Sequence, residues 1–220
     1  MKNTNRLERP ALALIALLAW LGVGVFYYIV WHNPESSEIN AFQLTLGFLN
    51  YFTILTNLLV AISSTISLLA PQSALGRFFS SPNVRSPIAL YIVIVGIVFN
   101  VMLRALITRV GFADQMANEL RHLVVPVLYV LFWLFIVPKG VLNWRQPIYW
   151  LIYPLVYLVW VAVYGGFTGR YPYSFMDVGN IGYTKVLTNS LMLIVLFFIV
   201  GEIFVGVDRL LGRKRNNQIS

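Results

Sequence analysis

One apolar stretch of this chain, residues 39–70, carries hydroxyl and amide side chains where a membrane-embedded segment would normally be apolar. On a helix that turns about 100° per residue, five of these side chains fall within roughly 80° of one another. The five are Gln43, Asn50, Thr53, Asn57 and Ser64. Polar groups at membrane depth cost free energy unless they are paired, so the stripe marks either a reactive site or contacts between helices. We therefore expect it to face the interior of a helix bundle.

His122 is the one histidine that lies at membrane depth in the sequence, and it could take and return a proton. The unperturbed pKa of imidazole lies closest to neutrality among side chains, which suits that role. Asn118 precedes it by about one helical turn, so the two share a face. Pro126 cannot donate a hydrogen bond to the carbonyl of residue 122, and its ring bends the helix. The sequence thus predicts a kink at His122 with an unpaired backbone oxygen, a suitable place for a polar pocket.

A further polar pair, Asn100 and Arg104, lies four residues apart in the apolar stretch 86–108. We expect Arg104 near the outer membrane interface, where it could extend its charged group toward water or counter a carboxylate. Together with Arg121 it could also hold an anionic head group. A simpler interpretation applies to the threonines and asparagines, because such residues often only bond a neighbouring helix, at about 0.6 kcal/mol each.

The elements that position these residues follow from the composition. Of the 220 residues, 59% are hydrophobic and 11% are charged, whereas a soluble domain carries about 25% charged residues. An apolar helix of about 20 residues crosses the hydrocarbon core of a bilayer. We predict an all-α polytopic membrane protein whose six-transmembrane-helix bundle forms a single domain over residues 1–220. The expected spans are 10–31, 39–70, 86–108, 116–137, 147–165 and 184–208.

Composition also excludes several kinds of chemistry. Cysteine is absent, which removes thiolate nucleophiles, disulfides and thiolate metal sites. Histidine occurs twice, at His32 and His122, too few for a multi-histidine metal centre. We therefore expect no metal and no cofactor. The net charge of +8 does not predict nucleic-acid binding, because the basic residues fall in loops and tails where membrane topology would place them.

The orientation follows from the same basic residues. With six spans both termini lie on one side, and that side collects eleven of the sixteen Lys and Arg residues. Because positive charge gathers on the cytoplasmic face, we expect both termini to be cytoplasmic. The first span follows basic residues but is too long for a cleaved signal peptide, so it is interpreted as a retained anchor. The compact loops favour a bacterial cell membrane.

Three short motifs occur in order along the chain. They are Asn50-Tyr51-Phe52-Thr53, Arg121-His122 followed by Val125-Pro126, and Tyr171-Pro172-Tyr173 with Phe175-Met176-Asp177. This order resembles the six-helix androgen-induced and androgen-dependent membrane protein family and its bacterial relatives. Eukaryotic members of that family are threonine hydrolases that cleave fatty acid esters of hydroxy fatty acids. The resemblance implies a lipid ester as substrate, Thr53 as nucleophile and His122 as base.

In that mechanism an acyl ester forms on Thr53 and is then hydrolysed. Asn50, Asn57 or Asn100 could donate hydrogen bonds to the oxyanion, and Asp177 could orient His122 only if its loop folds inward. Two other functions stay open. One is a non-catalytic lipid or small-molecule carrier, in which Arg104, Arg121 and His122 bind a head group. The other is a proton-coupled transporter that uses His122 and Glu202. Oligomeric state does not follow from the sequence.

Overall fold

The computed structural model describes residues 4–33, 39–106 and 111–216, and these are helical with no strand among them. Six helical segments are long and apolar enough to cross a bilayer, which confirms the predicted all-α class and makes this a multi-pass membrane protein. The segments are Arg6–Trp31, Phe52–Leu69, Pro82–Leu106, Phe112–Phe135, Gln146–Thr168 and Val178–Arg213. Residues 107–108 of the predicted third span lie outside the described residues.

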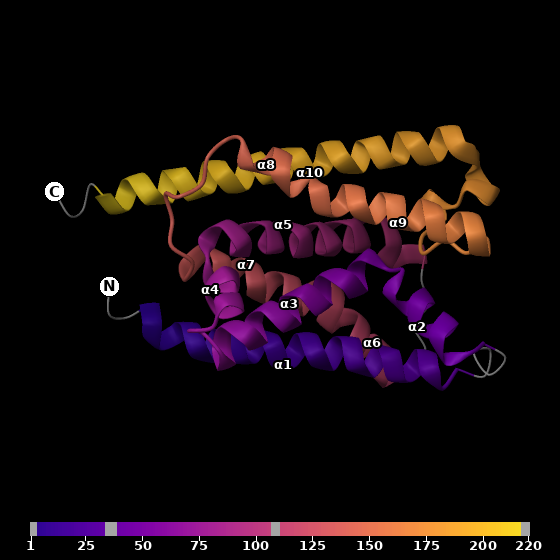
Figure 1. Ribbon diagram of the computed structural model, residues 1–220, viewed down its shortest axis with the longest axis horizontal. Helices are drawn as coiled ribbons and strands as arrows, with labels where there is room; N and C mark the ends of the chain where they lie inside the picture. The colour runs from indigo at the N-terminus through magenta and orange to yellow at the C-terminus, as the bar shows by residue number, and fades with distance from the viewer. Residues whose placement is uncertain (1–3, 34–38, 107–110, 217–220) are drawn as a thin grey trace. The chain divides into compact units, whose positions relative to one another are not determined.

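Contacts divide the chain into two compact units, which are described one at a time. Unit 1 comprises Met1–Phe48 and Thr53–Pro138, and unit 2 comprises Leu49–Phe52 and Lys139–Ser220. In unit 1, helix α1 (Thr4–Trp31) packs against the segment 112–135 (Figure 1). The same unit contains the short helix α4 (Ala74–Ser80), which Ser73 caps by accepting a hydrogen bond from Gly76 N.

Residues 39–70 do not form the one continuous helix that the sequence predicts. They form α2 (Ala41–Leu49) and α3 (Phe52–Leu69), with the break at Asn50 and Tyr51 (Figure 1). The hydroxyl of Tyr157 donates to Asn50 O at 2.9 Å and accepts from Phe52 N at 3.2 Å, so it pairs two backbone groups at the break. The predicted single stripe is therefore wrong: Gln43 lies on α2 and is exposed, whereas Thr53 and Asn57 on α3 are buried.

The third and fourth spans each contain a π-turn. Helix α5 (Pro82–Val98) continues through the π-turn η2 (Phe99–Leu103) into η3 (Arg104–Leu106). The fourth span consists of α6 (Phe112–Glu119), the π-turn η4 (Leu120–Val124) and α7 (Val125–Phe135). Both spans begin four residues earlier than predicted. Helix α5 packs along α7, and its buried Arg85 forms an ion pair with Glu8 of α1, with 2.8 Å between Nη2 and Oε1.

Unit 2 holds α8 (Gln146–Trp150), α9 (Ile152–Thr168), η5 (Ser174–Met176) and α10 (Val178–Asn216). Helices α8 and α9 are separated at Leu151, because Pro154 has no N–H to donate to the carbonyl of Trp150. Helix α10 is interrupted at Gly182, whose φ of 79° belongs to the left-handed region. The regular part of α10 thus begins close to the predicted start at residue 184.

Candidate functional site

The π-turn η4 sets the orientation of His122 in unit 1. Pro126 removes one backbone donor, and the helix responds by widening over Leu120–Val124 rather than by bending alone. The ring of His122 is buried, with 5% of its surface exposed. Its Nδ1 lies 2.9 Å from Asn118 O. Because a carbonyl only accepts hydrogen bonds, Nδ1 carries a hydrogen, and in the neutral ring the basic lone pair lies on Nε2.

The ring of Phe99 packs against one face of the His122 imidazole. Phe99, in η2, stacks on His122 with 3.7 Å between ring centroids and 19° between ring planes. The stack and the bond to Asn118 fix both the plane and the rotation of the imidazole. No sequence signal distinguishes Phe99 from the other aromatic residues of the chain, so sequence reasoning missed it.

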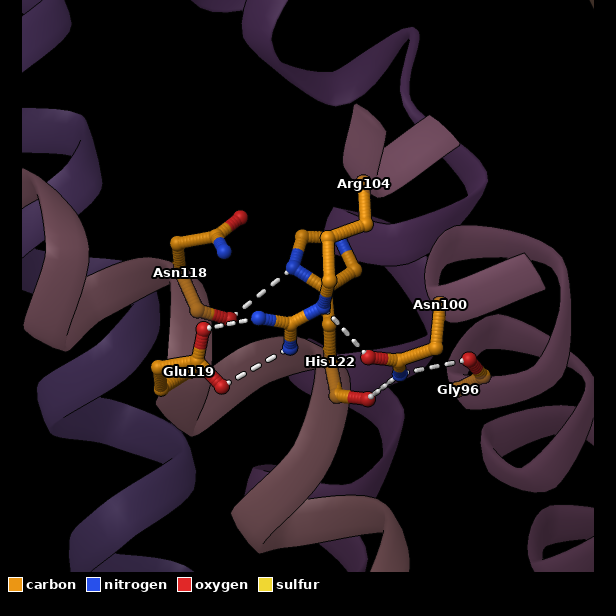
Figure 2. A network of polar contacts seen from close by, with 6 residues as sticks. All are labelled: Gly96, Asn100, Arg104, Asn118, Glu119 and His122. Atoms are coloured by element: carbon orange, nitrogen blue, oxygen red, sulfur yellow. Dashed lines mark hydrogen bonds and ion pairs between the residues drawn. The ribbon is translucent and has the colours of Figure 1, made fainter. Parts of the chain in front are cut away.

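The backbone oxygen that Pro126 leaves unpaired has a partner. Asn100 Nδ2 donates to His122 O at 2.9 Å and to Gly96 O at 2.8 Å, as Figure 2 shows. A Cβ added at Gly96 would lie 3.3 Å from both His122 O and Pro126 Cβ, so glycine permits this close approach of α5. The helix at residue 122 is thus widened into a π-turn, and its carbonyl is not unpaired as predicted, because an asparagine from the third span donates to it.

Asn57 makes the equivalent contact from α3. Its Nδ2 donates to Arg121 O at 3.2 Å and to Thr53 O at 2.9 Å. The turn of α3 that carries Thr53 is therefore joined to the residue that precedes His122. Both hydrogens of each amide are directed to carbonyl oxygens, so Asn57 and Asn100 could serve an oxyanion only by giving up one of these bonds. Their role in this structure is to bond helices together.

Thr53 is the second residue of α3, and 8% of its surface is exposed. It therefore points into the protein and not toward lipid, as the hydrolase interpretation requires. The first four N–H groups of an α-helix have no partner within the helix, and the break before Phe52 places Thr53 among them. Polar residues continue along α3 from this turn, and Thr56, Asn57, Ser63, Ser64 and Ser67 are buried as well.

Asn50, the remaining candidate oxyanion donor, lies at the break itself and is 3% exposed. Its backbone oxygen accepts from Tyr157, and its Oδ1 has no hydrogen-bond partner. Tyr157 is the residue of this region that sequence reasoning missed. It is one of several tyrosines in the fifth span, and its partners lie 105 and 107 residues away in the chain.

The two arginines predicted to bind a head group have different surroundings. Arg104 is exposed and forms a two-pronged ion pair with Glu119, at 2.7 and 2.9 Å, while its Nε donates to Asn100 Oδ1 at 2.8 Å (Figure 2). This confirms the expectation that Arg104 counters a carboxylate. Arg121 is buried, with its guanidinium carbon 3.7 Å from the ring centroid of Phe26 and its Nε donating to Ala117 O. Head-group binding by either arginine stays a prediction.

Asp177 has a contact of its own in unit 2. Its Oδ1 accepts from Asn180 N at 3.1 Å and so caps the start of α10. In unit 1 the group that orients His122 is the carbonyl of Asn118. Among the described residues, no group of three or more His, Asp or Glu side chains is arranged to hold a metal ion. Comparison with known protein families, curated proteins and solved structures finds no match to this chain.

Proposed function

We propose that this protein is an integral membrane hydrolase that cleaves lipid esters, with Thr53 as nucleophile and His122 as general base. The observation that carries the proposal is the fixed imidazole: the bond from Nδ1 to Asn118 O leaves the lone pair on Nε2, inside the same unit that buries Thr53. Asn57 supports it further, because it links the Thr53 turn to the neighbour of His122.

In the proposed reaction, Nε2 takes the hydroxyl proton of Thr53 as Oγ1 attacks the ester carbonyl carbon. The bond from that carbon to the alcohol oxygen breaks, and Nε2 returns the proton to the departing alcohol. Water then attacks the acyl ester on Thr53, giving one proton to Nε2, and that proton passes to Oγ1 as the fatty acid leaves. No cofactor takes part in these steps.

The oxyanion formed in both steps needs hydrogen-bond donors. We favour the backbone N–H groups that follow Phe52 in the first turn of α3, because they lie at the positive end of the helix; the N–H of Phe52 itself donates to Tyr157. Asn50 adds a side-chain amide three residues before Thr53. Asn57 and Asn100 are the weaker candidates, since their amide hydrogens already bond carbonyls.

The substrate class rests on the resemblance to the threonine hydrolases that cleave fatty acid esters of hydroxy fatty acids. A lipid ester also suits a nucleophile buried in a membrane-spanning helix. Labelling of the purified protein with a fluorophosphonate probe tests the chemistry. We expect Thr53→Ala and His122→Ala to abolish labelling, while Thr56→Ala, another buried threonine of α3, retains it. Undiminished labelling of the first two variants would exclude the mechanism and favour a non-catalytic lipid carrier.

We further propose that both termini lie in the cytoplasm of a bacterial cell, because eleven of the sixteen Lys and Arg residues fall on the side of the termini. The chain contains no cysteine, so single cysteines report position without background. Gln72→Cys and Ser174→Cys replace exposed residues in the loops that follow the second and the fifth span, which six spans would put on opposite sides of the membrane. An impermeant maleimide should label Ser174→Cys in intact cells and Gln72→Cys only after permeabilisation. The reverse pattern would overturn the orientation.

A further inference from the structure

Unit 2 contains an apolar groove that the proposed ester chemistry does not use. Its volume is about 490 Å³, within the usual range of roughly 300–1,000 Å³ for small-molecule sites. Its walls come from α9, from the loop that follows it and from the N-terminal half of α10. The lining residues are Leu158, Val159, Val161, Ala162, Tyr171, Met176, Val178, Tyr183, Val186, Leu187, Ser190, Leu191 and Ile194. The side-chain polar atoms of this lining are three hydroxyls and no charged group.

Gly165 allows close packing at one end of the groove. A Cβ added at Gly165 would lie 2.1 Å from Cε1 of Tyr171, so the tyrosine ring rests directly on α9 at this position. The neighbouring Gly166 has nothing within 4 Å of the equivalent point. The loop is also fixed to α10, because Asn189 Nδ2 donates to Phe175 O at 2.9 Å. The groove is thus built by specific contacts between two spans and their connection.

The length of the groove matches one leaflet of a bilayer. The lining runs along α10 from Tyr183 to Ile194, which is about 16 Å of helix at 1.5 Å per residue. Half of the roughly 30 Å hydrocarbon core is about 15 Å. Wall residues such as Leu187 and Leu191 are 68% and 62% exposed, so the groove opens toward the space that lipid occupies around a membrane-spanning helix. An acyl chain of the leaflet on the side of the 169–177 loop fits these dimensions.

The charges at the loop end of the groove select the head group. From residue 146 to residue 201 the charged residues are Arg170, Asp177 and Lys185. Arg170 directly precedes the lining residue Tyr171 and is exposed, whereas Lys185 lies on the face of α10 opposite to the lining residues Tyr183 and Leu187. The carboxylate of Asp177 accepts a hydrogen bond from the backbone at the start of α10. Arg170 is therefore the cation at this end of the groove, where it favours an anionic lipid by about 1 kcal/mol.

We propose that the groove between α9 and α10 is a binding site for an anionic lipid, with one acyl chain along Tyr183–Ile194 and the head group at Arg170. The inference does not depend on the proposed hydrolysis, because it uses no residue of the Thr53 and His122 site. An inactive hydrolase would retain this lipid, and loss of the lipid would leave the assignment of Thr53 untouched.

Native mass spectrometry of the full chain in detergent, titrated with dioleoyl-phosphatidylglycerol or dioleoyl-phosphatidylcholine, tests the proposal. We expect the protein to retain the anionic lipid in preference to the zwitterionic one. Ala162→Phe places a ring in the groove and should weaken retention of phosphatidylglycerol about tenfold or more. Val163→Phe is the matched control, because Val163 is an exposed residue of α9 outside the lining. It should leave retention unchanged.

Two further pairs of variants separate the acyl chain from the head group. Arg170→Gln should weaken binding of phosphatidylglycerol about fivefold and leave phosphatidylcholine unaffected, whereas Lys185→Gln, on the opposite face of α10, should change neither. Gly165→Ala should weaken both lipids by moving the ring of Tyr171, whereas Gly166→Ala should not. Equal retention of the two lipids by the unmodified chain would overturn the head-group assignment. Equal effects of Ala162→Phe and Val163→Phe would overturn the groove as the site.

Discussion

Tyr157→Phe tests how the break between α2 and α3 is maintained. The substitution removes one oxygen that accepts from Phe52 N at 3.2 Å and donates to Asn50 O at 2.9 Å. Asn50, Phe52 and Tyr157 are 3%, 8% and 6% exposed, so water does not readily replace that oxygen. Leaving a buried polar group unsatisfied costs about 1–3 kcal/mol. Two such groups predict a loss of roughly 2–4 kcal/mol in the free energy of unfolding, less than a simple sum because the backbone relaxes.

The measurement is detergent-titrated unfolding of the purified protein, followed by amide hydrogen exchange at Phe52. Tyr164→Phe is the control, because it deletes the same hydroxyl from the same helix at a half-buried position. We expect Tyr157→Phe to unfold more readily and to exchange the Phe52 amide faster, with little change for Tyr164→Phe. Equal stability of the two variants, with unaltered exchange at Phe52, would show that the hydroxyl does not maintain the break. Fluorophosphonate labelling should also fall in Tyr157→Phe, because Thr53 directly follows Phe52, whose N–H donates to the Tyr157 hydroxyl.

Three further outcomes are expected. Asn100→Leu removes the donor of the kink carbonyl and should lower the free energy of unfolding by about 1–3 kcal/mol, measured by the same titration. Burial lowers the pKa of Lys139 from its usual 10.5 to about 8, against the opposing attraction of Asp208. The unfolded chain therefore binds more protons between pH 8 and pH 10.5, so stability should rise with pH across that window and the rise should vanish in Lys139→Met. Gly206→Ala should stabilise α10 by about 0.5–1 kcal/mol, because the added Cβ would lie 3.7 Å from its nearest neighbouring atom and so fits without a clash. Gly212→Ala should destabilise it, because that Cβ would lie 2.4 Å from facing backbone.

The sequence predicted the fold class and the number of spans, because both depend on long apolar runs that a bilayer requires, whereas the bounds of the second span were wrong. It also predicted that Pro126 disturbs the regular helix near His122, where the structure has the π-turn η4, since the missing donor of Pro126 is a local property of the chain. Those features need no knowledge of distant residues. The π-turn η4 extends the same logic, as a widened turn is one way for a helix to accommodate a proline.

The break at Asn50 and Tyr51 was not predictable in this way. No proline or glycine lies at residues 48–53, and the partner that pairs the broken backbone comes from a tyrosine more than 100 residues later. The same limit applies to the two asparagines. Their positions on helix faces were evident, but the carbonyls that Asn57 and Asn100 contact depend on packing. The sequence indicated that Arg104 could counter a carboxylate, and the structure identifies that carboxylate as Glu119.

The asparagine contacts at the proline kink have a consequence for biogenesis. Asn57 and Asn100 both precede Pro126 in the chain, so translation delivers these amides before the carbonyls of Arg121 and His122. When the segments are inserted in that order, the amides of Asn57 and Asn100 are already in the membrane as the later segment leaves the translocon. The carbonyl oxygens of Arg121 and His122 can then be paired as soon as the proline-containing segment enters the bilayer. An unpaired carbonyl in the hydrocarbon core would cost several kcal/mol of free energy.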